Sequence, residues 1–336
     1  MLMLNPSKIL FSIMLVMGSL ISISSNSWPA TWIGLEINLL AFIPLMYYKH
    51  NMMSAEATMK YFIVQAMASS MLLTIMILNF MFLVFKSEHL ESMISLTLLI
   101  KMGAAPFHMW FPTVMEGLSW MNCVILMTWQ KLAPFIILSY LNFNQSIILF
   151  AMVSSIVFGS IGGLNQTSVR KIMAYSSINH MGWMLMGMLI SENLWQVYFI
   201  IYVILSSTIM IIFYSLSSYH MNQITFKFMS PIMKMLLLLN LMSLGGLPPF
   251  LGFLPKWMII QISYYSDLWF ITLLMVSFTL VTLFYYIRLS MSSLLINYNQ
   301  LKSQKSFSMK NSTLIAIMTT MSLLTLPLYS MFYLLL

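Results

Sequence analysis

Long apolar runs, interrupted only by short polar, proline or glycine segments, constrain this chain most strongly. About 20 helical residues cross the hydrocarbon core of a membrane, where a lipid-facing backbone must satisfy its own hydrogen bonds. With 60% hydrophobic and only 7% charged residues, the chain cannot be a soluble globular protein, and an all-α polytopic membrane protein is predicted. The runs define eleven transmembrane segments: Ile9–Ser25, Ala30–Tyr47, Ala57–Phe85, Ser92–Pro112, Leu118–Leu141, Ser146–Gly163, Lys171–Ile190, Leu194–Tyr219, Pro231–Ile262, Leu268–Ile287 and Thr313–Leu336.

Basic residues divide the connections between these segments into two groups. Loops on the retained side of a membrane collect Lys and Arg. With eleven spans, one side holds Lys8, Lys49, Lys60, Arg170, Lys171, Lys227, Lys234, Arg288, Lys302, Lys305 and Lys310, together with Glu56 and Glu116. The other side holds Lys86 as its one base, with Glu88, Glu91, Glu192 and Asp267. This asymmetry predicts an odd number of spans, with the N-terminus on the basic side and the C-terminus across the membrane.

Four charged residues remain deep inside the apolar segments, namely Glu36, Lys101, Lys131 and Lys256. An ionised group at the centre of a membrane helix costs about 2.5 to 3.5 kcal/mol on insertion scales. A buried lysine near a movable carboxylate can gain and lose a proton, which arginine cannot readily do. These four residues are therefore candidates for a proton relay, and the alternative for each is a structural role, with the lysines extending to the headgroups.

Histidine adds a less specific candidate in the seventh segment. His180 can change its charge near neutral pH, which suits a proton carrier, but a hydrogen-bonded packing residue is an equal alternative. Ser176, one helical turn earlier, is a possible local partner. His108 follows a proline near the end of the fourth segment, and we interpret it as structural.

Glycine and proline interrupt the fourth and ninth segments beside two of the lysines. The fourth contains Gly103 and Pro106, and the ninth contains Gly245, Gly246, Pro248 and Pro249. Proline removes a backbone donor, so both segments are predicted to be broken helices that line a polar cavity, although a hinge for packing is an alternative.

The two interrupted segments lie five segments apart and therefore cross the membrane in opposite directions. This pattern predicts two inverted five-helix repeats, a form typical of transport proteins. We place the repeats at residues 9–141 and 146–288, a basic-side connection at 289–312 and a terminal helix at 313–336, all in a single integral membrane domain, residues 1–336.

Other features argue against several kinds of site. The one cysteine, Cys123, excludes a disulfide framework and a zinc or iron–sulfur site built from thiolates of this chain. No phosphate-binding loop and no histidine pair suited to haem is present, so no cofactor or metal bound by this chain is expected. The net charge of +8 comes from scattered bases that form no nucleic-acid-binding surface.

Five stretches carry a specific resemblance: Trp32–Asn38, Lys101–Pro112, Met127–Pro134, Gly162–Trp183 and Ser243–Trp257. Over essentially the whole chain, the sequence resembles the NADH dehydrogenase subunit 2 family of animal mitochondria, particularly its insect form. This is one of the antiporter-like subunit families of respiratory complex I. The resemblance implies the shorter animal version, which lacks the first three spans of its bacterial relatives.

The resemblance also implies a location and roles for the buried charges. The basic side would be the matrix side of the mitochondrial inner membrane, and the partners would be other membrane and accessory subunits of complex I. NADH, FMN, iron–sulfur clusters and ubiquinone would be bound elsewhere in that complex. Glu36 and Lys101 would form a charge pair at one end of a proton path, with Lys131 as its central lysine and Lys256 as its terminal one.

The expected function is therefore proton translocation by a core membrane subunit that does not itself oxidise NADH. Two alternatives belong to other classes. A free-standing cation/proton antiporter would use the same lysines and broken helices. A structural membrane scaffold would explain the spans but not the energetic cost of the central lysines.

Overall fold

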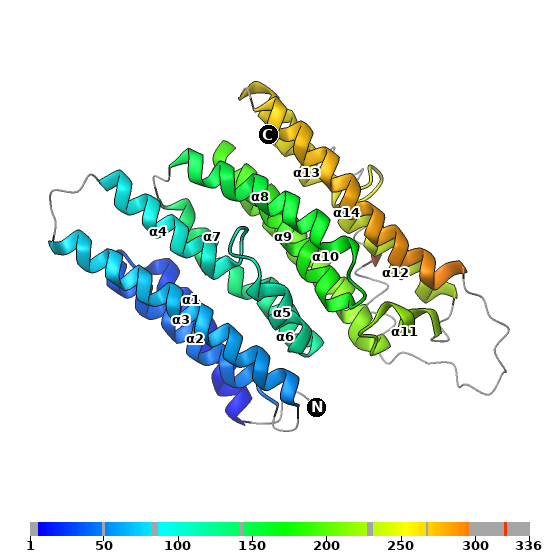
Figure 1. The fold of residues 1–336 in the computed structure, drawn as a ribbon, viewed down its shortest axis with the longest axis horizontal. Coiled ribbons are helices and arrows are strands. Elements are labelled where there is room, and N and C mark those ends of the chain that lie inside the picture. Colours follow the sequence, from blue (N-terminus) through cyan, green and yellow to red (C-terminus); the bar gives the residue numbers. More distant parts are fainter. Residues whose placement is uncertain are drawn as a thin grey trace. The chain divides into compact units, whose positions relative to one another are not determined.

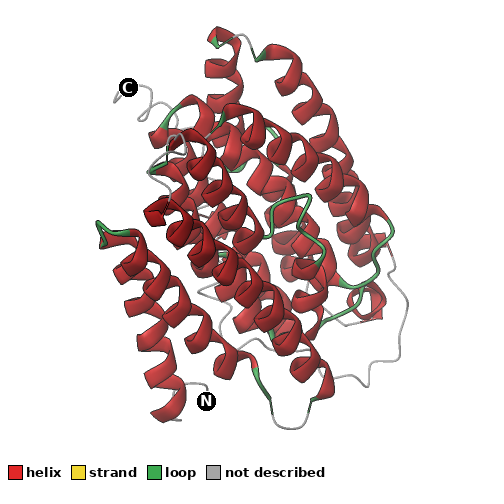
Figure 2. Cartoon of the chain, turned by 60° about the vertical axis from the view of Figure 1, so that its left-hand side comes forward, coloured by secondary structure: helices red, strands yellow, loops and turns green. Residues whose placement is uncertain are grey.

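A computed structural model describes residues 6–48, 51–81, 87–141, 144–226, 231–266, 268–295 and 319–320. These residues form α-helices and no strand, and their one isolated β-bridge joins Ser168 and His220 (Figure 2). The all-α prediction is confirmed for the described residues. Their helices fall into two compact units, with the boundary between Ser155 and Ile156.

The first unit contains the helices that carry Glu36, Lys101 and Lys131 (Figure 1). Within it, α2 packs on α1 and α3, α3 packs on α4 and α5, and α4 packs on α7. The bounds are α1 Pro6–Ser24, α2 Trp28–Met46, α3 Met52–Met81, α4 Ser87–Met102, α5 Trp110–Gly117, α6 Trp120–Met127 and α7 Trp129–Ser139, and α8 (Gln145–Leu164) crosses the boundary between the units.

Small residues bring α1 and α2 into close contact. A Cβ added at Gly34 would lie 2.5 Å from the backbone nitrogen of Ser22, and one at Gly18 would lie 2.9 Å from that of Asn38. Small side chains allow such close approach, and packing of this kind drives helix association where lipid removes the hydrophobic driving force. This contact fixes the position of α2, which carries Glu36.

The second unit contains the helices that carry His180 and Lys256. Helix α9 is its most buried helix, and α10, α13 and α14 pack against it. The bounds are α9 Val169–Ile190, α10 Glu192–Leu216, α11 Met221–Phe226, α12 Pro231–Gly245, α13 Phe253–Tyr265 and α14 Trp269–Leu295.

The helix lengths agree with a polytopic membrane protein. Seven helices in the described part of the chain are long and apolar enough to cross a membrane, and Met233–Gly245 is a shorter apolar helix. As predicted, the fourth segment is divided into α4 and α5, and the ninth into α12 and α13. Apart from residues 319–320, the predicted terminal helix lies outside the described residues, as do Lys49, Lys86, Lys227, Asp267 and the connection beyond Leu295.

The fifth predicted segment is also interrupted, which the sequence analysis missed. Thr128 separates α6 from α7, with φ −112° and ψ −71°. Its Oγ1 donates a 2.7 Å hydrogen bond to the carbonyl oxygen of Val124, and Pro134 has no N–H to donate to the carbonyl of Gln130. A threonine and a single proline thus distort this helix without glycine, close to Lys131.

Two further helical regions differ from the predicted boundaries. The short helix α11 lies where only a connection was expected, between the eighth and ninth segments. Helix α14 continues to Leu295, eight residues beyond the predicted end at Ile287. Neither difference moves a candidate site residue.

Candidate functional site

Helix α4 ends in a glycine cap directly after Lys101. Gly103 has φ +73°, a left-handed conformation that glycine adopts without strain. Its N–H donates to the carbonyl of Ile100, and the N–H of Ala104 donates to that of Leu99. These two bonds form a Schellman motif, which ends a helix cleanly and satisfies its last carbonyls. The chain then continues through a cis peptide bond at Pro106.

Helix α12 ends in the same motif. Gly246 has φ +78°, its N–H donates to the carbonyl of Ser243, and the N–H of Leu247 donates to that of Met242. Lys256, from the following helix α13, reaches back and donates a 2.8 Å hydrogen bond from Nζ to the carbonyl oxygen of Gly245. The second break is therefore closed by the lysine that the sequence analysis singled out.

Both breaks place a lysine at the C-terminal end of a half-helix. Lys101 lies in the last turn of α4, and the Lys256 ammonium contacts the last carbonyl of α12. A helix C-terminus carries a partial negative charge, which attracts a cation. Lys101 is 7% exposed and Lys256 is 5% exposed, so both side chains are held in the protein interior rather than at its surface.

Lys131 lies in a different electrostatic environment. It is the third residue of α7, so the nearest end of its own helix is the N-terminus, which carries a partial positive charge. Its side chain is 1% exposed, and Nζ lies 4.8 Å from the centroid of the Phe111 ring. This distance is within the range of a cation–π interaction.

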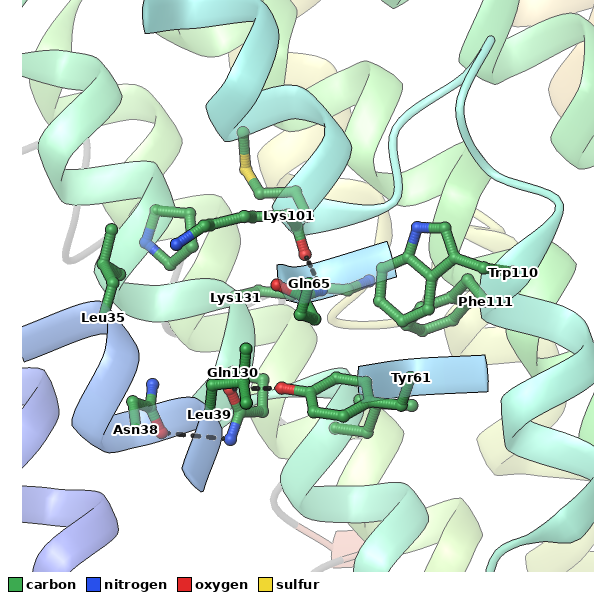
Figure 3. A pocket seen from close by; sticks show the side chains of 13 residues that line it. Leu35, Asn38, Leu39, Tyr61, Gln65, Lys101, Trp110, Phe111, Gln130 and Lys131 are labelled. Carbon is green, nitrogen blue, oxygen red and sulfur yellow. Dashed lines mark hydrogen bonds between the residues drawn. The ribbon is translucent and has the colours of Figure 1, made fainter. Parts of the chain in front are cut away.

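A small cavity in the first unit brings Lys101 and Lys131 together. It has a volume of about 20 Å³, which exceeds the roughly 10 to 15 Å³ that one water molecule requires. In Figure 3 the Lys101 side chain points toward Leu35, whereas Lys131 extends toward Phe111. The lining residues are Leu35, Asn38, Leu39, Tyr61, Gln65, Lys101, Met102, Trp110, Phe111, Leu126, Gln130, Lys131 and Pro134.

Uncharged polar side chains connect the helices around this cavity. The Tyr61 hydroxyl donates to Oε1 of Gln130 at 3.3 Å, and Nε2 of Gln130 donates to Oδ1 of Asn38 at 3.1 Å. On α3, Nε2 of Gln65 donates to the carbonyl oxygen of Lys101 at 3.1 Å. These bonds link α2, α3, α4 and α7 around the two lysines.

Glu36 lies on α2, close enough to Lys101 for electrostatic attraction between their charges. Its Oε2 is shielded from solvent and accepts no hydrogen bond from the described residues. By contrast, Lys60 and Glu56 form an ion pair at the surface, with Nζ 2.6 Å from Oε1. Glu36 and Lys101 are thus neighbouring charges without a direct ion pair, so a change in either separation or hydration can alter their interaction.

His180 lies in the second unit within a cluster of aromatic hydroxyl groups. Its Nδ1 is 2.8 Å from the hydroxyl of Tyr198, and its ring centroid is 5.3 Å from that of Tyr202. His108 instead contacts the carbonyl oxygen of Pro106, with Nδ1 at 3.3 Å. His180 therefore has a side-chain partner on another helix, whereas the contact of His108 with Pro106 is local to the α4 break.

The uncharged polar residues that surround the lysines were not predicted as site residues. Charge, glycine and proline within the spans identified the candidates, so Asn38, Tyr61, Gln65 and Gln130 were not among them. An amide inside an apolar segment carries a similar signal, because burial of an amide without a partner is costly. Gln65 and Gln130 could have been found by that criterion, although their partners could not.

Comparison with known proteins agrees with this architecture. A family model described as NADH:quinone oxidoreductase/Mrp antiporter, transmembrane, matches residues 25–283. The chain is 50% identical over 338 residues to NADH-ubiquinone oxidoreductase chain 2 of Aedes aegypti, covering 98% of this chain and 99% of that protein. It is 49% identical over 335 residues to the protein of the same name from Anopheles gambiae, covering 97% and 98%.

A solved structure shows the same fold at much lower sequence similarity. A chain in the structure of respiratory complex I from Thermus thermophilus with bound aureothin superposes with a TM-score of 0.83 at 19% identity. The match covers 96% of this chain and 78% of that one. Together, the family model and the near full-length relatives identify this chain as a member of the NADH:quinone oxidoreductase/Mrp antiporter transmembrane family, in its NADH-ubiquinone oxidoreductase chain 2 branch.

Proposed function

We propose that this chain is a core membrane subunit of a proton-pumping NADH:ubiquinone oxidoreductase, and that it moves protons through a relay of Glu36, Lys101, Lys131 and Lys256. His180 is a further candidate for this relay. Electron transfer from NADH to ubiquinone takes place in other subunits, so this chain binds no redox cofactor of its own. Its relatives named NADH-ubiquinone oxidoreductase chain 2 support this assignment to the complex.

The observation that carries the proposed mechanism is the cavity shared by Lys101 and Lys131. Both lysines line a space of about 20 Å³ that also has amide and hydroxyl groups in its wall. Proton transfer from the ammonium group of one lysine to the neutral amine of the other requires either direct contact or an intervening hydrogen-bonding group. A polar cavity with room for water supplies such a group, and Glu36 lies near enough to influence the charge on Lys101.

The proposed topology has eleven spans in two inverted five-helix repeats followed by a terminal helix. The repeated Schellman motif at Gly103 and Gly246 supports this symmetry, because each repeat would contain one helix that ends inside the membrane beside a lysine. The two breaks match in backbone conformation but not in the order of their residues. Lys101 precedes the break in the fourth segment, whereas Lys256 follows the break in the ninth.

The proposed location is the mitochondrial inner membrane, with the N-terminus on the matrix side and the C-terminus on the intermembrane-space side. The excess of Lys and Arg in one set of connections supports this orientation. The partners would be the other membrane subunits and accessory subunits of the complex, and the exposed apolar faces of helices such as α1 would contact lipid or those subunits.

Replacement of Lys131 by methionine tests the relay directly. Methionine keeps much of the side-chain volume but cannot carry a proton, so an assembled complex with Lys131→Met should lose at least tenfold in NADH-driven proton pumping in liposomes. Lys60→Met is the matched control, because Lys60 is an exposed lysine whose ion pair lies at the surface. Normal pumping by assembled Lys131→Met complexes would overturn the relay and favour a scaffold. Cation/proton exchange by the purified single chain would favour an antiporter.

A further inference from the structure

We propose that Tyr61 and Gln65 on α3, together with Gln130 on α7, are positioning residues that fix the separation of Lys101 and Lys131. None of the three carries the proton. The inference rests on the proposed proton relay, because a fixed separation between two lysines matters only if a proton passes between them.

Helix α3 presents two polar side chains on one face toward the two lysine-bearing helices. Tyr61 and Gln65 are four residues apart and therefore lie one above the other on the helix. Tyr61 donates to the side-chain oxygen of Gln130, the residue immediately before Lys131. Gln65 donates to the backbone carbonyl of Lys101. One face of α3 thus contacts the backbone of Lys101 directly and, through the side chain of Gln130, the residue next to Lys131.

The bond from Gln65 to Lys101 also gives a hydrogen-bond donor to a carbonyl near the end of a helix. Lys101 is in the last turn of α4, where the regular i to i−4 bonding ends. A carbonyl there that accepts from Gln65 is held at a fixed point relative to α3. The backbone of Lys101 sets the point from which its side chain extends. By fixing this backbone, the bond from Gln65 limits where the ammonium group can lie.

Gln130 connects a fourth helix, α2, to the same arrangement. While its oxygen accepts from Tyr61, its nitrogen donates to Oδ1 of Asn38 on α2. Asn38 is two residues from Glu36, so the bond also ties the helix of the relay carboxylate to the helix of Lys131. Successive helical side chains point about 100° apart, which lets Gln130 face these partners while Lys131 turns toward Phe111.

Apolar packing alone would hold these helices less specifically. In lipid, helix association gains little from the hydrophobic effect, and interhelical hydrogen bonds select one arrangement over its neighbours. Tyr61, Gln65 and Asn38 are each buried, and all four polar side chains line the cavity shared by the lysines. The polar contacts are thus concentrated where the spacing between two titratable groups decides whether a proton can pass.

Substitutions that remove the hydrogen bonds of Gln65 or Gln130 but keep the side-chain volume test this inference. We expect Gln65→Met and Gln130→Met, each in the assembled complex, to slow NADH-driven proton pumping about tenfold and to shift its pH profile. Asn122→Leu is the matched control. Its amide is about as buried as that of Gln65 and donates a 2.8 Å interhelical bond to the carbonyl of Leu45, but it does not line the cavity.

The control separates positioning from stability. Asn122→Leu should lower the thermal midpoint of the complex as much as the glutamine variants do, but leave the pH profile of pumping unchanged. Tyr61→Phe keeps the ring contacts with Phe42 and Trp110 and removes only the hydroxyl. If the methionine variants fail to assemble, the pH profile of pumping is measured on Tyr61→Phe instead. We expect the same shift in that profile.

Lys131→Met, prepared and measured in the same way, distinguishes failure of the positioning role from failure of the proton relay. If it abolishes pumping while Gln65→Met, Gln130→Met and Tyr61→Phe behave like Asn122→Leu, the positioning role is wrong and the relay stands. If Lys131→Met itself pumps normally, the relay is wrong and the positioning role falls with it.

Discussion

A methyl group at Gly246 should disable the second half of the proposed relay, whereas one at Gly245 should not. Gly246 has φ +78°, where an alanine costs about 1 to 2 kcal/mol because its Cβ approaches the following carbonyl oxygen. The added Cβ would also lie 2.8 Å from Nζ of Lys256, 3.0 Å from its Cδ and 3.1 Å from its Cε. Gly246→Ala therefore strains the backbone and displaces the lysine at once.

The size of the displacement follows from these distances. Ordinary contact with a Cβ begins near 3.4 Å, so Nζ must move by about 0.6 Å, the difference from 2.8 Å. Its bond to the carbonyl of Gly245 is also 2.8 Å long, and a shift of this size can extend it beyond the usual range of about 3.2 Å. A hydrogen bond from a charged donor contributes about 1.5 to 3 kcal/mol, so its loss would lower the population of Lys256 in this position by about 10- to 150-fold.

Gly245→Ala adds the same methyl group one residue earlier and supplies the control. Its Cβ would find its nearest atoms at 3.6 Å, on Leu283 and Tyr286. Gly245 is the last residue of α12 and needs no left-handed conformation, so alanine should be neutral or slightly stabilising there.

The assay compares both variants with the parent complex in liposomes, by NADH oxidation, proton pumping and thermal midpoint. We expect slow pumping and a lower midpoint for Gly246→Ala alone. Equal pumping by the two alanine variants, at or near the parent rate, would refute the argument that Gly246 is required for the position of Lys256.

Three other substitutions follow from the same structure. Gly34→Ala should lower the stability of the α1–α2 packing by about 1 to 3 kcal/mol, because its Cβ would lie 2.5 Å from the backbone nitrogen of Ser22 and α1 would have to move away. An unchanged midpoint on thermal denaturation would contradict this. Glu36→Gln should slow pumping several-fold with assembly intact, since it removes a negative charge that attracts Lys101, and native electrophoresis measures assembly separately from pumping. Tyr198→Phe removes the 2.8 Å contact with His180 and should slow pumping about tenfold if His180 carries protons, whereas an effect on stability alone would assign His180 to packing.

The sequence predicted the main structural features of this site because membrane burial makes polar and glycine residues conspicuous. Lys101, Lys131 and Lys256 stood out as charges that lipid cannot accept, and the structure buries all three. Gly103 and Gly246 stood out as breaks, and both adopt positive φ. A resemblance to a known family then supplied the biological context that periodicity and charge alone could not.

The remaining features depend on contacts between distant parts of the chain. Tyr61 and Gln130 are hydrogen-bonded although they lie 69 positions apart in the sequence, and Gln130 and Asn38 are hydrogen-bonded although they lie 92 positions apart. Neither pair has a spacing that local helix geometry could indicate, since only residues three or four apart face one another on one helix. The break at Thr128 was missed for another reason, because a threonine bonded to a carbonyl one turn earlier has no distinctive sequence signature.

The positions of Lys101 and Lys256 relative to helix ends explain how charge can be kept inside a membrane protein without permanent ion pairs. A carboxylate bound tightly to each lysine would stabilise its charge, but would also hold the proton and so oppose transfer. At Gly246 the backbone supplies part of that stabilisation, because Nζ of Lys256 donates to the last carbonyl of α12. Lys101 lies in the last turn of α4, whose C-terminal end carries a partial negative charge. This attraction is weaker than that of a full opposite charge in contact. In the proposed relay, Glu36 would act at a distance on Lys101, so that modest movements of its helix would change the charge balance without breaking an ion pair.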